Sequence, residues 1–232
     1  MKLSVVIPVF NEKDTIAEIV KRVLTEKTPK EIIIIDDGST DGTKEEIEKL
    51  RNKEIKKFYH NVNRGKGAAV RTGIKNATGD VLIVQDADLE YNPKYYQKLL
   101  KPIIDGKTKV VYGSRLRTLP FRLWGKDKTP LPLHLLVNRF LSELTNLLYG
   151  SGLTDMETCY KMIDKEVYRK LSLVSNRFEI EPEITAKILR LGIEILEVPI
   201  TTRPRGYQEG KKIKTEDAFF AVWALIKYRF KK

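Results

Sequence analysis

The architecture of this 232-residue chain follows from the segment Val81-Leu82-Ile83-Val84-Gln85-Asp86-Ala87-Asp88-Leu89-Glu90. Four consecutive apolar residues predict a buried strand, and acids at alternate positions follow it. Open α/β sheets bind ligands beyond the carboxyl ends of their strands. Carboxylates there suit Mg²⁺ or Mn²⁺, which bind one or two of them and complete their shell with water and phosphate oxygens. An acidic turn that caps the next helix is the alternative, because a motif needs its structural context.

Apolar runs and helical periodicities alternate on both sides of this segment. We expect strands at 3–9, 31–35, 56–60, 81–84 and 109–112, with helices starting near 14, 43, 68 and 93. This alternation predicts an α/β fold with a Rossmann-like, mostly parallel sheet flanked by helices. Polar loops follow three of the strands, at 10–12, 36–38 and 86–88. In a parallel sheet these loops share one edge, so we expect them to meet at one crevice.

Composition and missing motifs narrow the classes of protein. No G-x-G-x-x-G follows the first strand and no G-x-x-x-x-G-K-[ST] occurs, which argues against a dinucleotide oxidoreductase and a P-loop NTPase. The net charge of +12 predicts an anionic partner, either nucleic acid, anionic lipid or a phosphorylated substrate. The lone Cys159 fits a reducing compartment. The chain starts directly in a strand, and no apolar run reaches the 18 or so residues of a membrane span, so we expect a cytoplasmic protein.

The second half of the chain has a different pattern. A proline-rich, basic stretch at 116–132 predicts a mobile loop, and an amphipathic helix is expected at 134–149. A further helix is expected at 181–191 and an edge strand at 194–200. The tail at 215–230 predicts an amphipathic helix that ends in basic residues. Such a helix either lies on a membrane surface, or packs on the catalytic core or on a partner subunit.

The chain carries four motifs in this order: Val6–Glu12, Ile35–Thr43, Asn63–Ala69 and Asp86–Asp88. Together they resemble family 2 glycosyltransferases with the GT-A fold. Three further stretches resemble the subgroup of dolichyl-phosphate mannose synthases and polyprenyl-phosphate glycosyltransferases: Gly113–Arg115, Thr154–Lys161 and the basic loop near Arg203. The resemblance covers nearly the whole chain. It implies one catalytic domain at 1–212, with a nucleotide-sugar half at 1–112 and an acceptor half at 113–212, followed by a helix at 213–232.

The resemblance also implies roles for individual residues. Those matching the nucleotide-sugar site are Pro8, Phe10, Glu12, Asp37, Lys66, Asp86, Ala87 and Asp88. Asp86, Asp88 and Glu90 match the metal site for Mg²⁺ or Mn²⁺, although many relatives have Gln in place of Glu90. Arg115, Arg139 and Ser142 match the acceptor-phosphate site, and Arg203, Arg205, Lys211 and Lys212 match the loop over the donor. Asp155 matches a polar site near the sugar and acceptor, with a structural cap as the alternative. Asp86, Asp88 and Arg115 are the expected catalytic residues.

The expected reaction is metal-dependent, inverting transfer of a hexose, mannose or glucose, from GDP- or UDP-hexose to a polyprenyl phosphate. A family 2 enzyme with a soluble saccharide acceptor is the nearest alternative, and a sugar nucleotidyltransferase is a more distant one. Nucleic acid is not an expected partner, because no recognition motif accompanies the charge. Relatives often carry transmembrane helices beyond the point where this chain ends. We therefore expect peripheral contact with the cytoplasmic face of a membrane, with a second copy or a membrane protein as an alternative partner.

Overall fold

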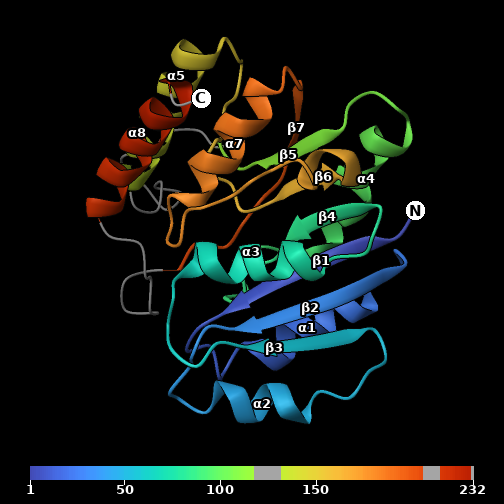
Figure 1. Ribbon diagram of the computed structural model, residues 1–232. Coiled ribbons are helices and arrows are strands. Elements are labelled where there is room, and N and C mark those ends of the chain that lie inside the picture. The colour runs from blue at the N-terminus through green and yellow to red at the C-terminus, as the bar shows by residue number, and fades with distance from the viewer. Residues whose placement is uncertain (118–131, 206–214, 231–232) are drawn as a thin grey trace, which may run out of the picture.

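The computed structural model describes residues 1–117, 132–205 and 215–230. Strands within these ranges form one seven-stranded sheet in the order β3-β2-β1-β4-β6-β5-β7 (Figure 1). They are β1 (Leu3–Val9), β2 (Lys30–Asp36), β3 (Ile55–Tyr59), β4 (Val81–Val84), β5 (Val110–Ser114), β6 (Lys161–Asp164) and β7 (Ile195–Pro199). Each neighbouring pair is parallel except the two pairs that include β6. The predicted α/β fold with a mostly parallel sheet is therefore confirmed, and β7 lies at the predicted edge.

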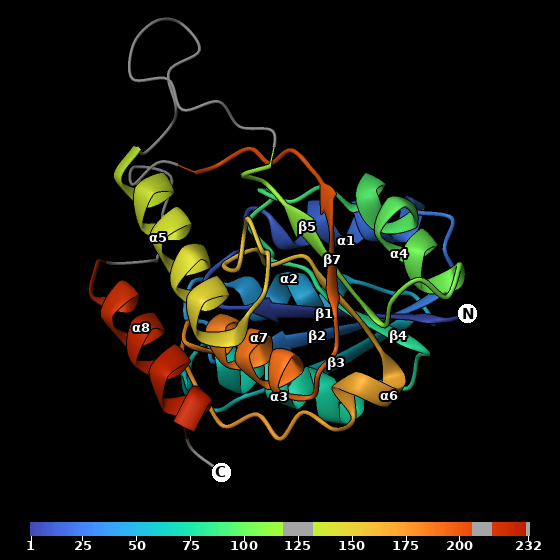
Figure 2. The ribbon, with the colours of Figure 1, turned by 90° about the horizontal axis from the view of Figure 1, so that it is seen from above.

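Helices cover both faces of the sheet. Figure 2 shows α1 and α4 on one side of it and α3 and α7 on the other. The helices are α1 (Ile16–Thr25), α2 (Thr43–Lys49), α3 (Lys66–Asn76), α4 (Tyr96–Ile104), α5 (Pro132–Tyr149), α6 (Lys165–Tyr168), α7 (Ile180–Arg190) and α8 (Thr215–Phe230), with a 3₁₀ turn at Pro93–Tyr95. Every residue of β1 and β2 is buried, as expected for parallel strands covered on both faces.

The strand β6 has no counterpart among the predicted strands. It inserts antiparallel between β4 and β5, which brings the second half of the chain into the sheet of the first. The strand is only four residues long and begins with the buried Lys161, so its sequence lacks the apolar run that marks β4. Because β6 runs antiparallel to β4, the segment before β6 lies beside the carboxyl end of β4.

Helices α5 and α8 pack against each other at one end of the sheet, and α8 also packs against α7 (Figure 2). One face of α8 buries Ala221, Ala224, Leu225 and Tyr228. None of the helices in the described ranges combines the length and the apolar character that a membrane span requires. The loop predicted at 116–132 lies almost entirely outside the described residues, as do Lys211 and Lys212.

Candidate active site

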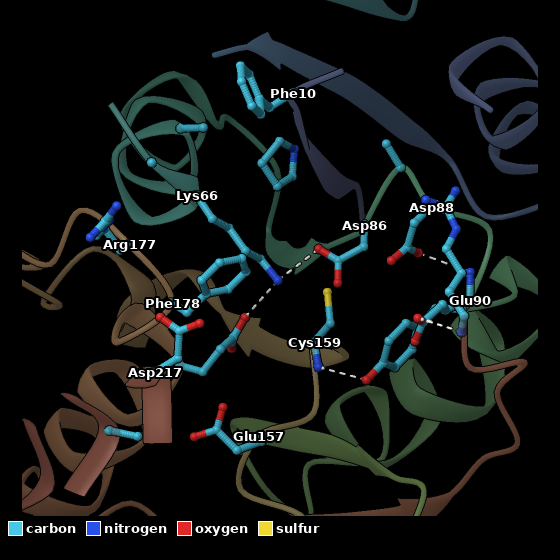
Figure 3. Close-up of a pocket in the computed structure, with 18 of the residues that line it drawn as sticks. Phe10, Lys66, Asp86, Asp88, Glu90, Glu157, Cys159, Arg177, Phe178 and Asp217 are labelled. Atoms are coloured by element: carbon cyan, nitrogen blue, oxygen red, sulfur yellow. Dashed lines mark hydrogen bonds and ion pairs between the residues drawn. The ribbon is translucent and has the colours of Figure 1, made fainter. Parts of the chain in front are cut away.

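The carboxyl ends of β1, β2 and β4 converge on a cavity of about 420 Å³ (Figure 3). The cavity-lining residues predicted from the sequence are Pro8, Phe10, Glu12, Asp37, Lys66, Asp86, Ala87, Asp88, Glu90, Arg115 and Arg205. Residues from the second half of the chain close the cavity on the other side, including members of α5, α7 and α8. The predicted meeting of three strand-end loops at one crevice is therefore observed.

Asp37, at the end of β2, organises the neighbouring glycine loop. Its buried carboxylate accepts hydrogen bonds from the backbone N–H groups of Arg64, at 3.0 Å, and Gly65, at 2.7 Å. It also contacts Nδ1 of His60 at 2.6 Å. Gly65 has a φ of 96° and a ψ of 157°, a conformation reserved almost entirely for glycine. A Cβ atom there would lie 2.4 Å from the carbonyl oxygen of Asn176, so the loop fits only without a side chain at this position.

Lys66 begins α3 and points into the cavity (Figure 3). Its Nζ atom lies 2.8 Å from Asp86 and 3.2 Å from Glu181. Glu181 is also paired with the buried Lys161, at 2.5 Å. Burial is the largest single influence and lowers the pKa of Lys66, but attraction to its neighbours together, Asp86 first among them, outweighs burial and raises this pKa well above its usual value. Lys66 is therefore a fixed cation beside the carboxyl end of β4.

Asp88 experiences the opposite electrostatic environment. Burial is the main reason that its pKa is raised to about 7, and repulsion by Asp86 and Glu90 adds to the effect. One of its oxygens accepts the backbone N–H of Glu90, at 3.0 Å. The Glu90 carboxylate in turn accepts the backbone N–H of Arg205, at 2.9 Å. In the described part of the chain, no three acidic, histidine or cysteine side chains are grouped closely enough to hold a metal ion together. The joint ligand set of Asp86, Asp88 and Glu90 thus stays a prediction.

The segment after β7 is bound to the loops that follow β1 and β4. The guanidinium of Arg205 pairs with the Glu12 carboxylate at 3.0 Å. The backbone N–H of Arg203 donates to the carbonyl of Glu90, also at 3.0 Å, while the Arg203 side chain is exposed and outside the lining. Of the two predicted donor-loop residues that the structure describes, Arg203 and Arg205, it is Arg205 whose side chain reaches the cavity.

Arg115 follows β5 directly and is held in a fixed orientation. Its Nε and Nη2 atoms donate to the two oxygens of Asp155, at 2.8 and 2.7 Å. Its backbone N–H donates to the same carboxylate at 2.8 Å, and its guanidinium lies over the ring of Tyr91. Desolvation lowers the pKa of Arg115, but attraction and hydrogen bonding to Asp155 act in the opposite direction, and the resulting pKa is well above its usual value. Asp155 thus positions a permanent cation at the cavity wall.

The structure does not bring Arg139 and Ser142 into the cavity lining. Ser142 is buried, and its hydroxyl donates to the carbonyl of Asn138 and accepts the backbone N–H of Met156. The face of α5 that lines the cavity instead carries Val137, Asn138 and Leu141.

Several lining residues are missing from the predicted site. They are Val9, Asn63, Gly65, Ala69, Tyr91, Glu157, Cys159, Arg177, Phe178, Glu181, Asp217, Ala218 and Ala221, besides the three residues of α5. Glu157 and Cys159 lie in the Thr154–Lys161 motif, and Glu181 lies among three acids at the start of α7. The three residues of α8 carry no local signal, because their place depends on how α8 packs.

Comparison with known proteins assigns the class. A model of the family described as Glycosyl transferase family 2 matches residues 4–172, which is more than half of the chain. The chain therefore belongs to glycosyl transferase family 2, and it is a glycosyltransferase.

Curated relatives place the chain near dolichyl-phosphate sugar transferases. It is 30% identical over 220 residues to the UDP-N-acetylglucosamine–dolichyl-phosphate N-acetylglucosaminyltransferase of Methanococcus voltae, covering 86% of this chain and 85% of the relative. It is 34% identical over 129 residues to the dolichol-phosphate mannosyltransferase of Pyrococcus furiosus, covering 52% of this chain and 37% of that protein. An uncharacterized protein of Methanocaldococcus jannaschii is 31% identical over 97% of this chain and 91% of its own length.

Solved structures confirm the GT-A fold. The glucosyl-3-phosphoglycerate synthase of Mycobacterium tuberculosis, solved with Mn²⁺, UDP and phosphoglyceric acid, has a TM-score of 0.68 at 20% identity, covering 99% of this chain and 78% of that one. The mannosyl-3-phosphoglycerate synthase of Rubrobacter xylanophilus has a TM-score of 0.72 at 19% identity, covering 98% of this chain and 72% of that one. At these identities the likeness establishes the fold alone.

Proposed function

We propose that this enzyme transfers a hexose from a GDP- or UDP-hexose to a polyprenyl phosphate, with inversion at the anomeric carbon. The observation that carries the proposal is the composition of one cavity. An acidic strand end (Asp86, Asp88), a half-buried arginine (Arg115) and apolar side chains of α5 and α8 (Val137, Leu141, Ala218, Ala221) all line it. In that order, these suit the divalent cation that accompanies a sugar diphosphate, an acceptor phosphate and a hydrocarbon chain. The names of the two dolichyl-phosphate relatives support the same acceptor class.

The donor side is assigned to the first half of the chain. Phe10 offers an aromatic face, and Glu12 and Asp37 offer carboxylates that accept hydrogen bonds from sugar hydroxyls or base N–H groups. Arg205, paired with Glu12, lies where a donor loop would close on the nucleotide. Lys66 supplies a fixed positive charge for the diphosphate.

Asp86 and Asp88 fit a divalent cation by the chemistry of their surroundings. Burial and repulsion by neighbouring carboxylates raise the pKa of Asp88, so a cation there would relieve an existing excess of negative charge. The M. tuberculosis enzyme of the same fold was solved with Mn²⁺ and UDP. Mg²⁺ or Mn²⁺ held by Asp86 and Asp88 would neutralise charge on the departing diphosphate.

The acceptor phosphate is already an anion, so the reaction needs no general base to create the nucleophile. An acceptor oxygen forms the bond to the anomeric carbon while the bond from that carbon to the β-phosphate oxygen breaks, and the electron pair leaves with the nucleoside diphosphate. The role of Arg115 is to orient the attacking phosphate through its planar guanidinium. Asp155 keeps the guanidinium in position.

A thermal-shift panel followed by transfer assays tests this assignment. UDP-glucose, UDP-N-acetylglucosamine and GDP-mannose are each added with MnCl₂ or MgCl₂. The correct donor at a hundred times its Kd contributes about 2.7 kcal/mol, which raises the Tm by roughly 5–10 °C in a chain of this size. Transfer of label from that donor to dolichyl phosphate supports the lipid acceptor. Transfer to 3-phosphoglycerate but not to dolichyl phosphate would assign a soluble acceptor instead.

A lipid acceptor requires contact with a bilayer, and the exposed face of α8 suits it. Phe219, Trp223 and Phe230 are 71%, 58% and 75% exposed. Lys227 and Arg229 lie in the last turn of the same helix. Apolar side chains beside basic ones are typical of helices that lie on anionic lipid. Helix α5, packed against α8, exposes further apolar residues, Leu136, Phe140 and Leu147. We therefore place the enzyme on the cytoplasmic face of a membrane through α5 and α8.

The double substitution of Phe219 and Trp223 by Gln is expected to weaken binding to vesicles of anionic phospholipid at least tenfold. The reason is the loss of apolar burial, worth about 1.5–3 kcal/mol for each side chain when fully buried. Co-sedimentation at low salt measures it, and wild-type binding should fall as salt rises. Ile104→Gln is the matched control, since this apolar residue on α4 is also exposed, at 60%. A wild-type protein that ignores anionic vesicles at low salt would contradict the membrane assignment.

A further inference from the structure

Glu157 lies in a segment whose backbone is fixed on both sides. The N–H of Met156 donates to a serine hydroxyl of α5, at 3.0 Å. The hydroxyl of Thr158 donates to a carbonyl of β5, at 2.6 Å, and the N–H of Cys159 donates to the hydroxyl of Tyr91, at 3.1 Å. The position from which the Glu157 side chain projects is therefore set by the fold.

The Glu157 carboxyl lines the cavity and has unused hydrogen-bonding capacity (Figure 3). Its Oε1 atom is shielded from solvent and has no hydrogen-bond partner among the described residues. A buried polar atom without a partner is unfavourable, and native structures rarely retain one without a reason. Burial also raises the pKa of Glu157 to about 7, so near neutral pH both the proton-donating and the purely accepting form are present. The Glu157 side chain can therefore form a hydrogen bond with a ligand bound in the cavity.

The chemistry of the ligand group follows from the surroundings. A phosphate is a poor match, because a carboxylate repels it. A hydroxyl both donates and accepts, so it pairs with either form of the carboxyl. A hydroxyl group is therefore the ligand group that fits both forms of Glu157.

The position of Glu157 identifies which hydroxyl. In Figure 3, Phe10 lies on one side of Asp86 and Glu157 on the other. Two residues before Glu157, Asp155 holds Arg115. Glu157 thus lies on the opposite side of Asp86 from the proposed nucleotide site. It is also close in the chain to Asp155, which holds Arg115, the residue assigned to the acceptor phosphate. The transferred sugar belongs between the diphosphate and the acceptor phosphate.

We propose that Glu157 binds a hydroxyl group of the transferred hexose and helps to select the sugar. This inference rests on the proposed function, because it takes the donor to be a nucleotide sugar. Sites built to hydrogen-bond a substrate hydroxyl discriminate strongly against sugars that lack it or present it differently, because a buried polar group is then left unpaired. Glu157 thus contributes little to affinity for the nucleotide and much to the choice of sugar.

Calorimetric titration with the full chain separates these two contributions. UDP and UDP-glucose, or GDP and GDP-mannose, are titrated with MnCl₂ into the wild type, Glu157→Ala and the control Glu166→Ala, which changes an exposed residue of α6. We expect Glu157→Ala to weaken the nucleotide sugar about 10- to 100-fold, the worth of a hydrogen bond to a charged group, and the nucleoside diphosphate less than twofold. Glu157→Asp, which retains the carboxyl but shortens its reach, should show the same split and serves if the alanine variant does not fold.

The outcomes are distinguishable. Equal losses for nucleotide and nucleotide sugar, or no loss for either, would overturn the role of Glu157 while leaving the enzyme class intact. A wild-type protein that binds neither nucleoside diphosphates nor nucleotide sugars would overturn the proposed donor class and the inference with it.

Discussion

Asp88→Asn is expected to reduce sugar transfer at least about a hundredfold, because a bound metal ion supplies several kcal/mol of charge stabilisation to a departing diphosphate. Metal-dependent binding of the nucleoside diphosphate should be lost with it. Radiolabel transfer and calorimetric titration with and without MnCl₂ measure the two effects. Asp80→Asn is the matched control, because Asp80 precedes the same strand at its opposite end, where it accepts the backbone N–H of Lys2. Unchanged metal-dependent affinity in Asp88→Asn would refute the metal assignment.

The same variant should be more stable than the wild type at high pH. The folded-state pKa of Asp88 is about 7, well above the value near 4 that an aspartate has in an unfolded chain. A carboxyl with a raised pKa lowers the free energy of unfolding, and this penalty is complete above pH 7. The penalty shrinks as the pH falls from 7 to 4 and is absent below pH 4. Without added metal, we expect Asp88→Asn to raise the Tm by a few degrees at pH 8 and to lose this advantage towards pH 4. A lower Tm at pH 8 would show instead that Asp88 supports the fold.

Local patterns predict the first half of the site well. The buried strands β1, β2 and β4 are short apolar runs followed by polar turns, so both the strands and the edge they share can be derived from sequence. Asp37, Asp86 and Asp88 meet in the cavity for this reason. The second half depends on contacts between distant segments. The insertion of β6 and the packing of α8 on α5 and α7 have no signature within their own residues.

Helix α5 shows how helical periodicity can leave the functional face undetermined. The helix is apolar on two sides, since Leu136, Phe140 and Leu147 form one exposed face while Leu141 is buried on another, so its amphipathic pattern does not identify the side that faces the cavity. Contacts with α8 and with the segment before β6 determine the orientation, and they take Ser142 into the interior. Asp155 is a related case. From sequence it is either a polar site residue or a cap, and in the structure it binds the side chain that faces the cavity.

Arg115→Lys is expected to reduce transfer to polyprenyl phosphate about a hundredfold or more, while affinity for the nucleoside diphosphate changes less than about twofold. Lysine keeps the positive charge but not the planar fork. In the wild type, Asp155 occupies the Nε and Nη2 atoms, so a third nitrogen stays outside that pair on a guanidinium whose orientation is fixed. A lysine ammonium cannot bind both oxygens of Asp155 and present a second donor in a defined direction. The acceptor phosphate should therefore be oriented less well in the variant, which lowers the rate of the transfer step.

The control and the contradicting outcome separate catalysis from folding. Arg117→Lys changes a nearby exposed arginine that donates to the carbonyl of Glu197, and it should leave transfer unchanged. Asp155→Asn keeps Arg115 but removes the charge of the fully buried partner of this ion pair, and breaking a fully buried pair typically costs about 3–5 kcal/mol. That variant should lose more thermal stability than Arg115→Lys, whose ammonium still pairs with Asp155. If Arg115→Lys weakens nucleoside diphosphate binding as strongly as it weakens transfer, Arg115 serves the donor rather than the acceptor phosphate.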